Sequence, residues 1–258
     1  MGVTQLITTF NRADQLSHSL NRLADGSLTK PDELIVVDDG GEDHTKDVCD
    51  SFANRLPIRY IYNNNRAWTI CSLARNIGVK EASHDWIVVS EPELFFISDV
   101  IPQFLGHTEE HPDEVISAGT IYFGRPGYVP TLDTDGLEIA GDYTPPMGVE
   151  AAIGWVAPFT ALYHRDWLME VGGWDEGFPG PWGWDDIDLL TRLRINGINQ
   201  YIALDVRALH QYHGPENRGD VDFANEGYFR AKQFDGNESK DHPHLIANKG
   251  IEWGKLRT

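Results

Sequence analysis

Two glutamates flank a proline at the end of an apolar run. The stretch IVVSEPELFF, residues 87–96, begins like a buried strand and then places Glu91 and Glu93 around Pro92. Side chains at positions i and i+2 of an extended segment fall on the same side, so both carboxylates face one way. Carboxylates placed like this suit Mg²⁺ or Mn²⁺, hard cations that take oxygen ligands. A solvent-facing turn is the alternative, and this segment alone favours the turn.

A pair of histidines, His210 and His213, closes a β-like run at residues 201–213. A single histidine at the end of a strand is usually a surface residue, whereas a pair favours contact with a metal or a phosphate. Manganese accepts a mixed shell of imidazole and carboxylate more readily than magnesium does. The histidines are therefore candidate partners of the glutamates.

Acidic and aromatic residues meet in GPWGWDDIDLL, residues 180–190. Asp185 and Asp186 stand where a helix begins, and acids there satisfy free N–H groups and the helix dipole. That explanation does not account for Trp182 and Trp184, two large aromatic residues in a glycine-rich turn. Aromatic faces beside carboxylates are a common way to hold a sugar, and a carboxylate there could act as a general base toward an acceptor hydroxyl.

The elements that must position these residues alternate between strand and helix. Apolar runs predict strands at residues 3–10, 33–39, 58–62 and 86–90, and apolar stripes at helical spacing predict helices at 12–25, 42–56 and 68–82. Strands that alternate with helices of this size indicate crossover units and a largely parallel sheet covered on both faces. The predicted fold class is therefore α/β.

Three of these strands have polar carboxyl ends. They carry, in chain order, Asn11 and Arg12, Asp38 and Asp39, and Glu91 and Glu93. Ligands of open α/β sheets bind at the carboxyl ends of the strands, so we expect all three ends to share one rim. A single strand that ends in an acid means little, but three that converge favour a site.

The second half of the chain lacks the regular alternation of strand and helix patterns. Residues 124–154 are rich in Gly and Pro with little periodicity, and we expect an active-site loop because long irregular segments are usually functional or disordered. Residues 159–178 predict a strand, a short helix and a turn, and residues 185–197 predict a helix with a glycine stop. The tail from about residue 235 is polar, and we expect its Trp253 to pack on the rest of the chain.

Composition limits the function classes. With 21 basic and 40 acidic side chains, the formal net charge is −19, which repels a nucleic-acid backbone. Two cysteines make no disulfide framework and fit a reducing compartment. No stretch reads as a membrane span or a signal peptide, so we expect a cytoplasmic protein. The sequence signatures of dinucleotide enzymes, P-loop NTPases, zincins and serine hydrolases are absent.

Four segments together resemble glycosyltransferases of the GT-A fold, and most of all the family 2 group. LITTFNR (6–12) resembles the opening strand and nucleotide-contacting turn, and LIVVDDGGEDHT (34–45) resembles the second strand of that family. Residues 73–96 resemble the run from an Arg-Asn pair to the Asp-x-Asp metal motif. VGGWDEGFPGPWGWDDIDLLTRLRING (171–197) resembles the Gly-Gly-Phe-Asp-Glu stretch with its following acid pair, and its Trp-Gly-Trp is similar to the β-1,4-galactosyltransferases.

The resemblance covers residues 3–220 and implies a fold. That fold is a three-layer α/β/α arrangement around a mixed, mainly parallel central sheet. We therefore expect one GT-A domain over residues 1–258, with a nucleotide-binding half at 1–97, an acceptor and catalytic half at 98–220 and a C-terminal extension at 221–258.

The resemblance also implies roles for individual residues. The implied nucleotide or donor contacts are Thr9, Asn11, Arg12, Asp38, Asp39, Arg75, Asn76 and Glu91. The implied ligands of Mn²⁺ or Mg²⁺ are Glu93, His210 and His213. Asp186 would be the general base, and Asp185 would bind hydroxyls of the acceptor or donor. Trp182 and Trp184 would bind the sugar or the acceptor.

The implied reaction is metal-dependent transfer of a sugar from a nucleoside-diphosphate donor, UDP-linked, to a saccharide or other hydroxyl acceptor with inversion. Two departures matter: Glu-Pro-Glu stands where the family has Asp-x-Asp, and two glycines of the galactosyltransferase motif are missing after Trp184. A degenerate, non-catalytic sugar- or nucleotide-binding domain is one alternative, favoured by Glu-Pro-Glu. A nucleotidyltransferase is another, although TTFNRADQ lacks the glycine of a phosphate loop. A glycosidase also uses paired acids but would not need the Arg-Asn pair or the histidines.

Overall fold

The computed structural model describes residues 1–65, 70–130, 139–143, 158–214, 221–234 and 239–257. In chain order the elements are β1 (Val3–Thr9), α1 (Ala13–Ala24), β2 (Glu33–Asp38), α2 (Thr45–Phe52), β3 (Ile58–Tyr62), α3 (Ser72–Glu81), β4 (Trp86–Ser90), β5 (Leu94–Phe96), α4 (Val100–Glu110), β6 (Glu114–Gly124), β7 (Ile139–Tyr143), β8 (Thr160–His164), α5 (Arg165–Glu170), α6 (Asp185–Ile195), β9 (Asn199–His210) and α7 (Val221–Ala231).

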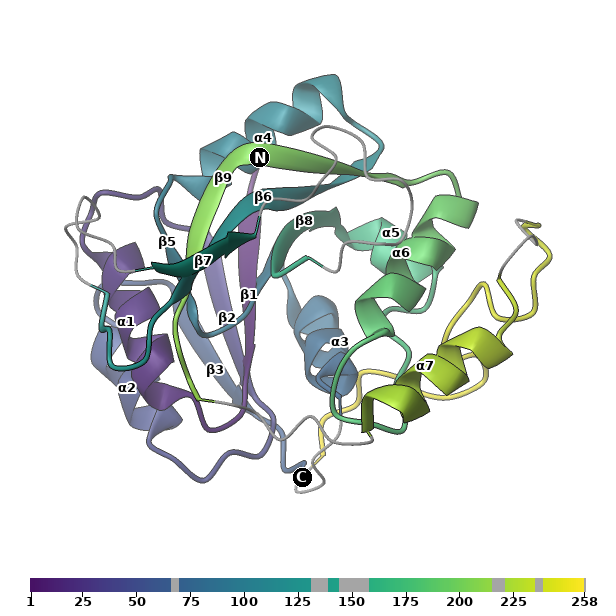
Figure 1. Cartoon of the computed structure of the whole chain (residues 1–258), viewed down its shortest axis with the longest axis horizontal. Coiled ribbons are helices and arrows are strands. Elements are labelled where there is room, and N and C mark those ends of the chain that lie inside the picture. The colour runs from purple at the N-terminus through teal and green to yellow at the C-terminus, as the bar shows by residue number, and fades with distance from the viewer. Residues whose placement is uncertain (66–69, 131–138, 144–157, 215–220, 235–238, 258) are drawn as a thin grey trace.

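One nine-stranded sheet runs through the described residues in the order β3-β2-β1-β4-β8-β6-β9-β5, with β7 paired to β6 (Figure 1). The first four strands in that order are parallel, and β6 is parallel to β9. Strands β5, β7 and β8 run antiparallel to their neighbours. The sheet is thus mixed with most strands in one direction, which confirms the predicted fold class.

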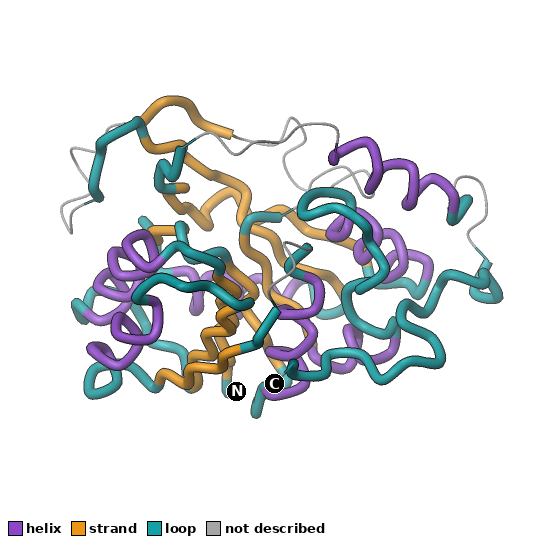
Figure 2. The backbone as a smooth tube through the Cα atoms, turned by 90° about the horizontal axis from the view of Figure 1, so that it is seen from below, coloured by secondary structure: helices purple, strands orange, loops and turns teal. Residues whose placement is uncertain are grey.

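Helices cover both faces of the sheet (Figure 2). The alternation of side chains along each strand creates two separate cores, as when Ile7 points to one face and Leu6 to the other. Helices α1, α2 and α4 bury their apolar stripes in the first core, and α3, α5 and α6 bury theirs in the second. The predicted three-layer arrangement follows from this burial.

The predicted strands and helices of the first half are present with shifted ends. The second predicted helix is shorter than its apolar stripe, since α2 ends at Phe52. The run expected at 201–213 forms β9, but that strand stops at His210 and leaves His213 in the following loop. Helices α4 and α7 and strands β5, β6 and β7 were not predicted from the sequence, although the buried Val100, Ile101 and Phe104 of α4 follow helical spacing.

The C-terminal residues 239–257 contain neither helix nor strand and lie along α3 and the loop after α5. Trp253 packs as expected, with Lys80 Nζ 4.2 Å from the centre of its ring. No helix in the described ranges has the length and hydrophobicity needed to cross a bilayer. Most of the expected active-site loop, at residues 131–138 and 144–154, lies outside the described residues.

Candidate active site

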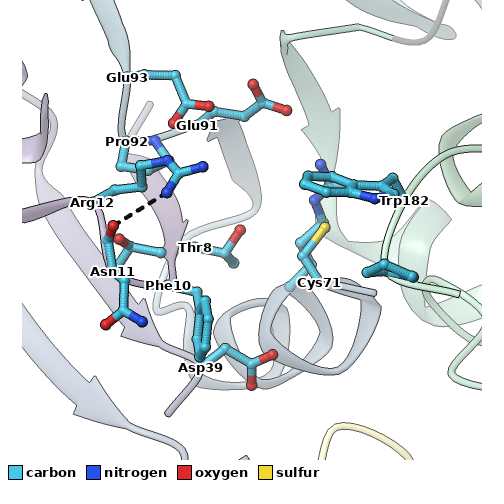
Figure 3. A pocket seen from close by; sticks show the side chains of 13 residues that line it. Thr8, Phe10, Asn11, Arg12, Asp39, Cys71, Glu91, Pro92, Glu93 and Trp182 are labelled. Atoms are coloured by element: carbon cyan, nitrogen blue, oxygen red, sulfur yellow. Dashed lines mark hydrogen bonds between the residues drawn. The ribbon is translucent and has the colours of Figure 1, made fainter. Parts of the chain in front are cut away.

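A cavity of about 340 Å³ opens where the carboxyl ends of β1, β2 and β4 meet (Figure 3). It is lined by Thr8, Thr9, Phe10, Asn11, Arg12, Asp39, Cys71, Arg75, Glu91, Pro92, Glu93, Pro181 and Trp182. The three polar strand ends therefore share one rim, as the sequence predicts. Trp182 lies across the cavity from Asn11 and Arg12 in Figure 3. The segment at residues 180–190 therefore reaches the rim from the second half of the chain.

The carboxylate of Asp39 is held from one side by two asparagines. Asn63 Nδ2 donates to Oδ1 at 2.6 Å and Asn65 Nδ2 donates to Oδ2 at 2.9 Å. Arg257, near the end of the chain, donates in turn to the amide oxygen of Asn65 at 2.6 Å and through its backbone N–H to that of Asn63 at 2.7 Å. Burial raises the pKa of Asp39 to about 6, although both asparagine hydrogen bonds oppose the shift.

The turn after β1 is fixed to the turn after β2. Asn11 has a φ of +52°, a left-handed conformation that asparagine tolerates better than most residues, and its Oδ1 accepts from the Glu42 N–H at 2.8 Å. Gly40 has a φ of +94°, and a Cβ there would lie 2.1 Å from the carbonyl oxygen of Asn65. Only glycine fits this approach, which brings Asn65 against Asp39.

The second group at the rim is the cluster of Glu93, His210 and His213. Glu93 Oε1 lies 3.5 Å from His210 Nε2 and 3.6 Å from His213 Nε2, and one ligand atom from each residue falls within 4.8 Å of the others. These separations exceed a good hydrogen bond but match atoms that share one ion, because ligands at about 2.1 Å from a metal are roughly 3–4 Å apart. Glu91 Oε2 lies 3.7 Å from His210 Nε2 at the edge of the cluster.

Strand pairing brings this cluster together. Strand β5 pairs antiparallel with β9, so Leu94, directly after Glu93, is opposite His210. The Gln211 N–H donates to the Glu93 carbonyl at 3.0 Å, and its side chain donates to Ser19 Oγ in α1 at 3.0 Å. Arg12 NH2 donates to His213 Nδ1 at 3.3 Å, so the cluster is in contact with the β1 rim.

A third group joins α3 to the start of α6. Arg75 NH1 donates to Asp185 Oδ2 at 3.0 Å and to Asp186 Oδ1 at 2.8 Å. Trp174 Nε1 also donates to Asp186 Oδ1, at 2.8 Å. Because Arg75 lines the cavity, its hydrogen bond to Asp186 places the Asp186 carboxylate next to the cavity wall. The pair of acids is held by the guanidinium of Arg75, a residue that is 5 % exposed.

Asp185 and Asp186 differ in environment. Asp185 is 4 % exposed, and burial together with the negative charge of Asp186 raises the pKa of Asp185, while Arg75 opposes the rise. Asp186 is partly exposed and, among the described residues, accepts its hydrogen bonds on Oδ1. The more accessible acid is therefore the one suited to meet an acceptor.

Seven predicted residues are absent from the lining of the cavity. Asp185 and Asp186 contact the lining residue Arg75, and His210 and His213 contact the lining residue Glu93, whereas Asp38, Asn76 and Trp184 have other partners. Asp38 accepts from Tyr60 Oη and the Gly41 N–H, both at 2.8 Å, and so fixes the turn after β2. Asn76 is fully buried against the backbone of Trp174. Trp184 stacks toward Phe229 of α7, with ring centres 5.4 Å apart. The predicted ligand contacts of Asp38, Asn76 and Trp184 therefore gain no support from their positions.

Five lining residues were not among the predicted site residues: Thr8, Phe10, Cys71, Pro92 and Pro181. A sequence signal existed for Phe10, because this large apolar residue stands between two polar rim residues. In the structure Phe10 is 38 % exposed. No comparable signal marked Cys71, because its position depends on how α3 packs. Burial raises the pKa of the Cys71 thiol well above its usual range.

Comparisons with known proteins identify the family of this chain. Residues 4–172 match the sequence profile of the family described as "Glycosyl transferase family 2". The chain is similar to validoxylamine A glucosyltransferase of Streptomyces hygroscopicus subsp. jinggangensis (29 % identical, covering 84 % of this chain and 57 % of that protein). It is also similar to chondroitin synthase of Pasteurella multocida (22 % identical, covering 85 % and 26 %). The chain thus spans little more than half of the first relative and about a quarter of the second.

Solved structures share the fold at low identity. TarS 1–349 of S. aureus in complex with UDP-GlcNAc superposes with a TM-score of 0.66 at 16 % identity and covers 85 % of this chain and 61 % of that one. The mannosyltransferase PcManGT of Pyrobaculum calidifontis in complex with GDP-Man and Mn²⁺ gives 0.59 at 15 % identity and covers 94 % and 67 %. The family profile covers more than half of the chain. The protein therefore belongs to glycosyl transferase family 2.

Proposed function

We propose that this protein transfers a sugar from a nucleoside-diphosphate donor, UDP-linked, to a hydroxyl group of an acceptor, with inversion at the anomeric carbon. One observation carries the proposal: a single cavity has the Glu93 cluster at one side and Arg75, which holds Asp186, at another. The first group suits a diphosphate with its cation, and the second suits proton removal from an acceptor. Family membership and the named activities of the similar proteins support the same reaction class.

The nucleotide would lie against the β1 and β2 rim. Asp39 offers a carboxylate to donors of the base or ribose, and Phe10 offers an aromatic face beside it. Arg12 supplies positive charge toward phosphates, which matters in a chain whose net charge is −19. The UDP-GlcNAc complex of TarS supports UDP as the donor nucleotide, whereas the GDP-Man complex of PcManGT makes GDP the comparison to test.

A divalent cation fits the cluster of Glu93, His210 and His213. One carboxylate and two imidazoles suit Mn²⁺ better than Mg²⁺, which prefers oxygen ligands alone. Held there, Mn²⁺ would offset negative charge on the departing diphosphate. The protein's own contribution is to keep the three ligand atoms together through the pairing of β5 with β9.

Asp186 would remove the proton of the acceptor hydroxyl. The acceptor oxygen then bonds to the anomeric carbon as the bond from that carbon to the diphosphate oxygen breaks. A single displacement of this kind places the new bond on the opposite face of the sugar, which is inversion. Trp182, on the cavity wall, offers an aromatic face for a sugar ring.

A donor screen tests this function. Purified protein with Mn²⁺ is supplied with UDP-, GDP- or dTDP-sugars and a panel of saccharide acceptors, and nucleotide release is measured. We expect release from UDP-sugars, and NMR of the product should show the opposite anomeric configuration from the donor. If no nucleotide is bound by calorimetry or released from any donor, the proposal is wrong.

The base assignment needs its own variant. Asp186→Asn should lower the transfer rate by about 10²–10⁴-fold, the usual contribution of a general base, and leave the Kd for UDP within about twofold. The matched control is Asp166→Asn, which alters a carboxylate on α5 with 82 % of its side chain exposed. Equal transfer rates in Asp186→Asn and wild type would remove Asp186 from the mechanism.

A further inference from the structure

Trp174 carries a buried polar group that the reaction described above does not use. The indole ring is completely buried, packed edge-on to Tyr163 with ring centres 5.6 Å apart. An indole has one N–H donor, and a buried donor needs an acceptor. That acceptor is Oδ1 of Asp186, 2.8 Å away.

Two donors meet on the same oxygen of Asp186. Arg75 NH1 approaches Oδ1 from α3, and Trp174 Nε1 approaches it from the loop before α6. Two donors on one oxygen fix the rotation of the carboxylate about its last side-chain bond. The other oxygen, Oδ2, then has a defined direction, which a carboxylate with a single donor would not have.

The Trp174 donor is itself held rigidly. Asn76 accepts from the Trp174 N–H and donates to the Trp174 carbonyl, both at 2.8 Å, and Asn248 donates to the same carbonyl at 2.7 Å. Gly173 comes so close that a Cβ there would lie 2.3 Å from Asn76 Oδ1. The ring therefore cannot follow Asp186 if that side chain rotates.

We propose that Trp174 is a positioning residue of the transfer reaction. Its indole N–H, acting with Arg75, holds the Asp186 carboxylate so that Oδ2 is presented to the acceptor hydroxyl. Asn76 acts one step further away, by fixing Trp174, which gives that residue a role without contact to the nucleotide. The inference rests on the proposed function, because it assigns Asp186 as the base.

The kinetic test is Trp174→Phe, which keeps an aromatic ring and removes the N–H. We expect kcat for transfer to fall about 10- to 100-fold, the range for one lost hydrogen bond to a charged group, with the KM for donor and the Kd for UDP within about twofold. In the Asp186→Asn background the same change should cause no further loss, because Trp174 acts through Asp186. An unchanged kcat, or an equal loss in both backgrounds, overturns the proposal.

Two additions separate shape from hydrogen bonding. Incorporation of 3-benzothienylalanine at position 174 keeps the shape of the indole and replaces its N–H by sulfur, so we expect the kcat of Trp174→Phe. Wild-type kcat with this residue would show that packing alone matters and would overturn the proposal. The control is Trp167→Phe, a tryptophan of α5 that packs on Trp86 and should keep wild-type kcat.

An activity-independent measurement distinguishes this inference from the proposed function. In ¹⁵N-labelled protein, the indole signal that disappears in Trp174→Phe should move strongly in Asp186→Asn. A signal that stays in place would refute the contact whatever the enzyme does. Full transfer by Asp186→Asn, with a signal that moves, would instead refute the base assignment and with it this role of Trp174.

Discussion

Replacement of the buried Lys232 by methionine should lower the free energy of unfolding, because Lys232 fixes the helix α6 that contains Asp186. Lys232 follows α7, is 5 % exposed, and its Nζ lies 2.6 Å from Asp175 Oδ2 and 2.5 Å from Asp188 Oδ1. Arg192 also pairs with Asp188, at 2.8 Å, and donates to the Val171 carbonyl. The four buried charges balance, and together they fix α6 to α7 and to the loop before α6.

The magnitude follows from this charge balance. Lys232→Met leaves the buried Asp175 without its lysine partner and with hydrogen bonds from Tyr228 Oη and the Gly177 N–H. The loss of one partner of a buried ion pair typically costs about 3–5 kcal/mol of the free energy of unfolding. For a chain of this size that corresponds to a fall in Tm of roughly 6–20 °C. Lys232→Met with Asp175→Asn restores the balance, since only Asp188 and Arg192 stay charged, and should recover most of the loss.

Urea unfolding followed by circular dichroism measures these differences at pH 7. Burial alone would raise the pKa of Asp175, but Lys232, the Gly177 N–H and Arg192 together outweigh burial and hold that pKa below its usual range. Because a lowered pKa contributes stability that is lost only in acid, the wild type should change little through Asp175 between pH 7 and 5. In Lys232→Met the unpaired acid can take up a proton, so the deficit should shrink toward pH 5.

A surface pair provides the control. Lys46→Met removes a lysine whose side chain is 62 % exposed and paired with Asp50, and we expect no measurable change in unfolding. The reasoning fails if Lys232→Met costs less than about 1 kcal/mol, or if the double variant is no more stable than the single one.

Three further changes test other parts of the site. Asp39→Asn should flatten the pH dependence of unfolding stability, because a folded pKa of about 6 means that wild-type stability grows by up to about 3 kcal/mol as the pH falls from 7 toward 4. Parallel pH profiles of the variant and the wild type would contradict this. Glu93→Ala should weaken Mn²⁺ binding, measured by calorimetry, at least about tenfold. The control is Glu110→Ala, which alters an exposed glutamate, and an unchanged Mn²⁺ affinity in Glu93→Ala would show that Glu93 is not a ligand. Gly173→Ala should cost about 1–3 kcal/mol in urea unfolding, since its φ is +69° and the new Cβ would meet Asn76; a neutral effect would show that this loop is not held tightly.

The sequence alone was sufficient for the fold class and for the position of the rim. Buried strands such as β1 and β2 have near-continuous apolar runs, and their helices have apolar stripes at helical spacing, so local patterns contain this information. The polar residues after each strand then had to meet, because parallel strands end at the same edge. Asp39 and Glu91 were predicted together for this reason and both line the cavity.

Only the tertiary structure decided which side chains meet within the site. Glu93 and His210 are far apart in the chain and become neighbours through the antiparallel pairing of β5 with β9, which no local pattern encodes. Asp186 is paired with Arg75 and Trp174 because α3 and α6 pack on the same face of the sheet. Helical spacing places a residue on a face of its own helix, whereas partners on other elements depend on strand order and packing. The sequence therefore predicted Arg75 as a nucleotide contact, whereas its hydrogen bond to Asp186 became apparent only in the structure.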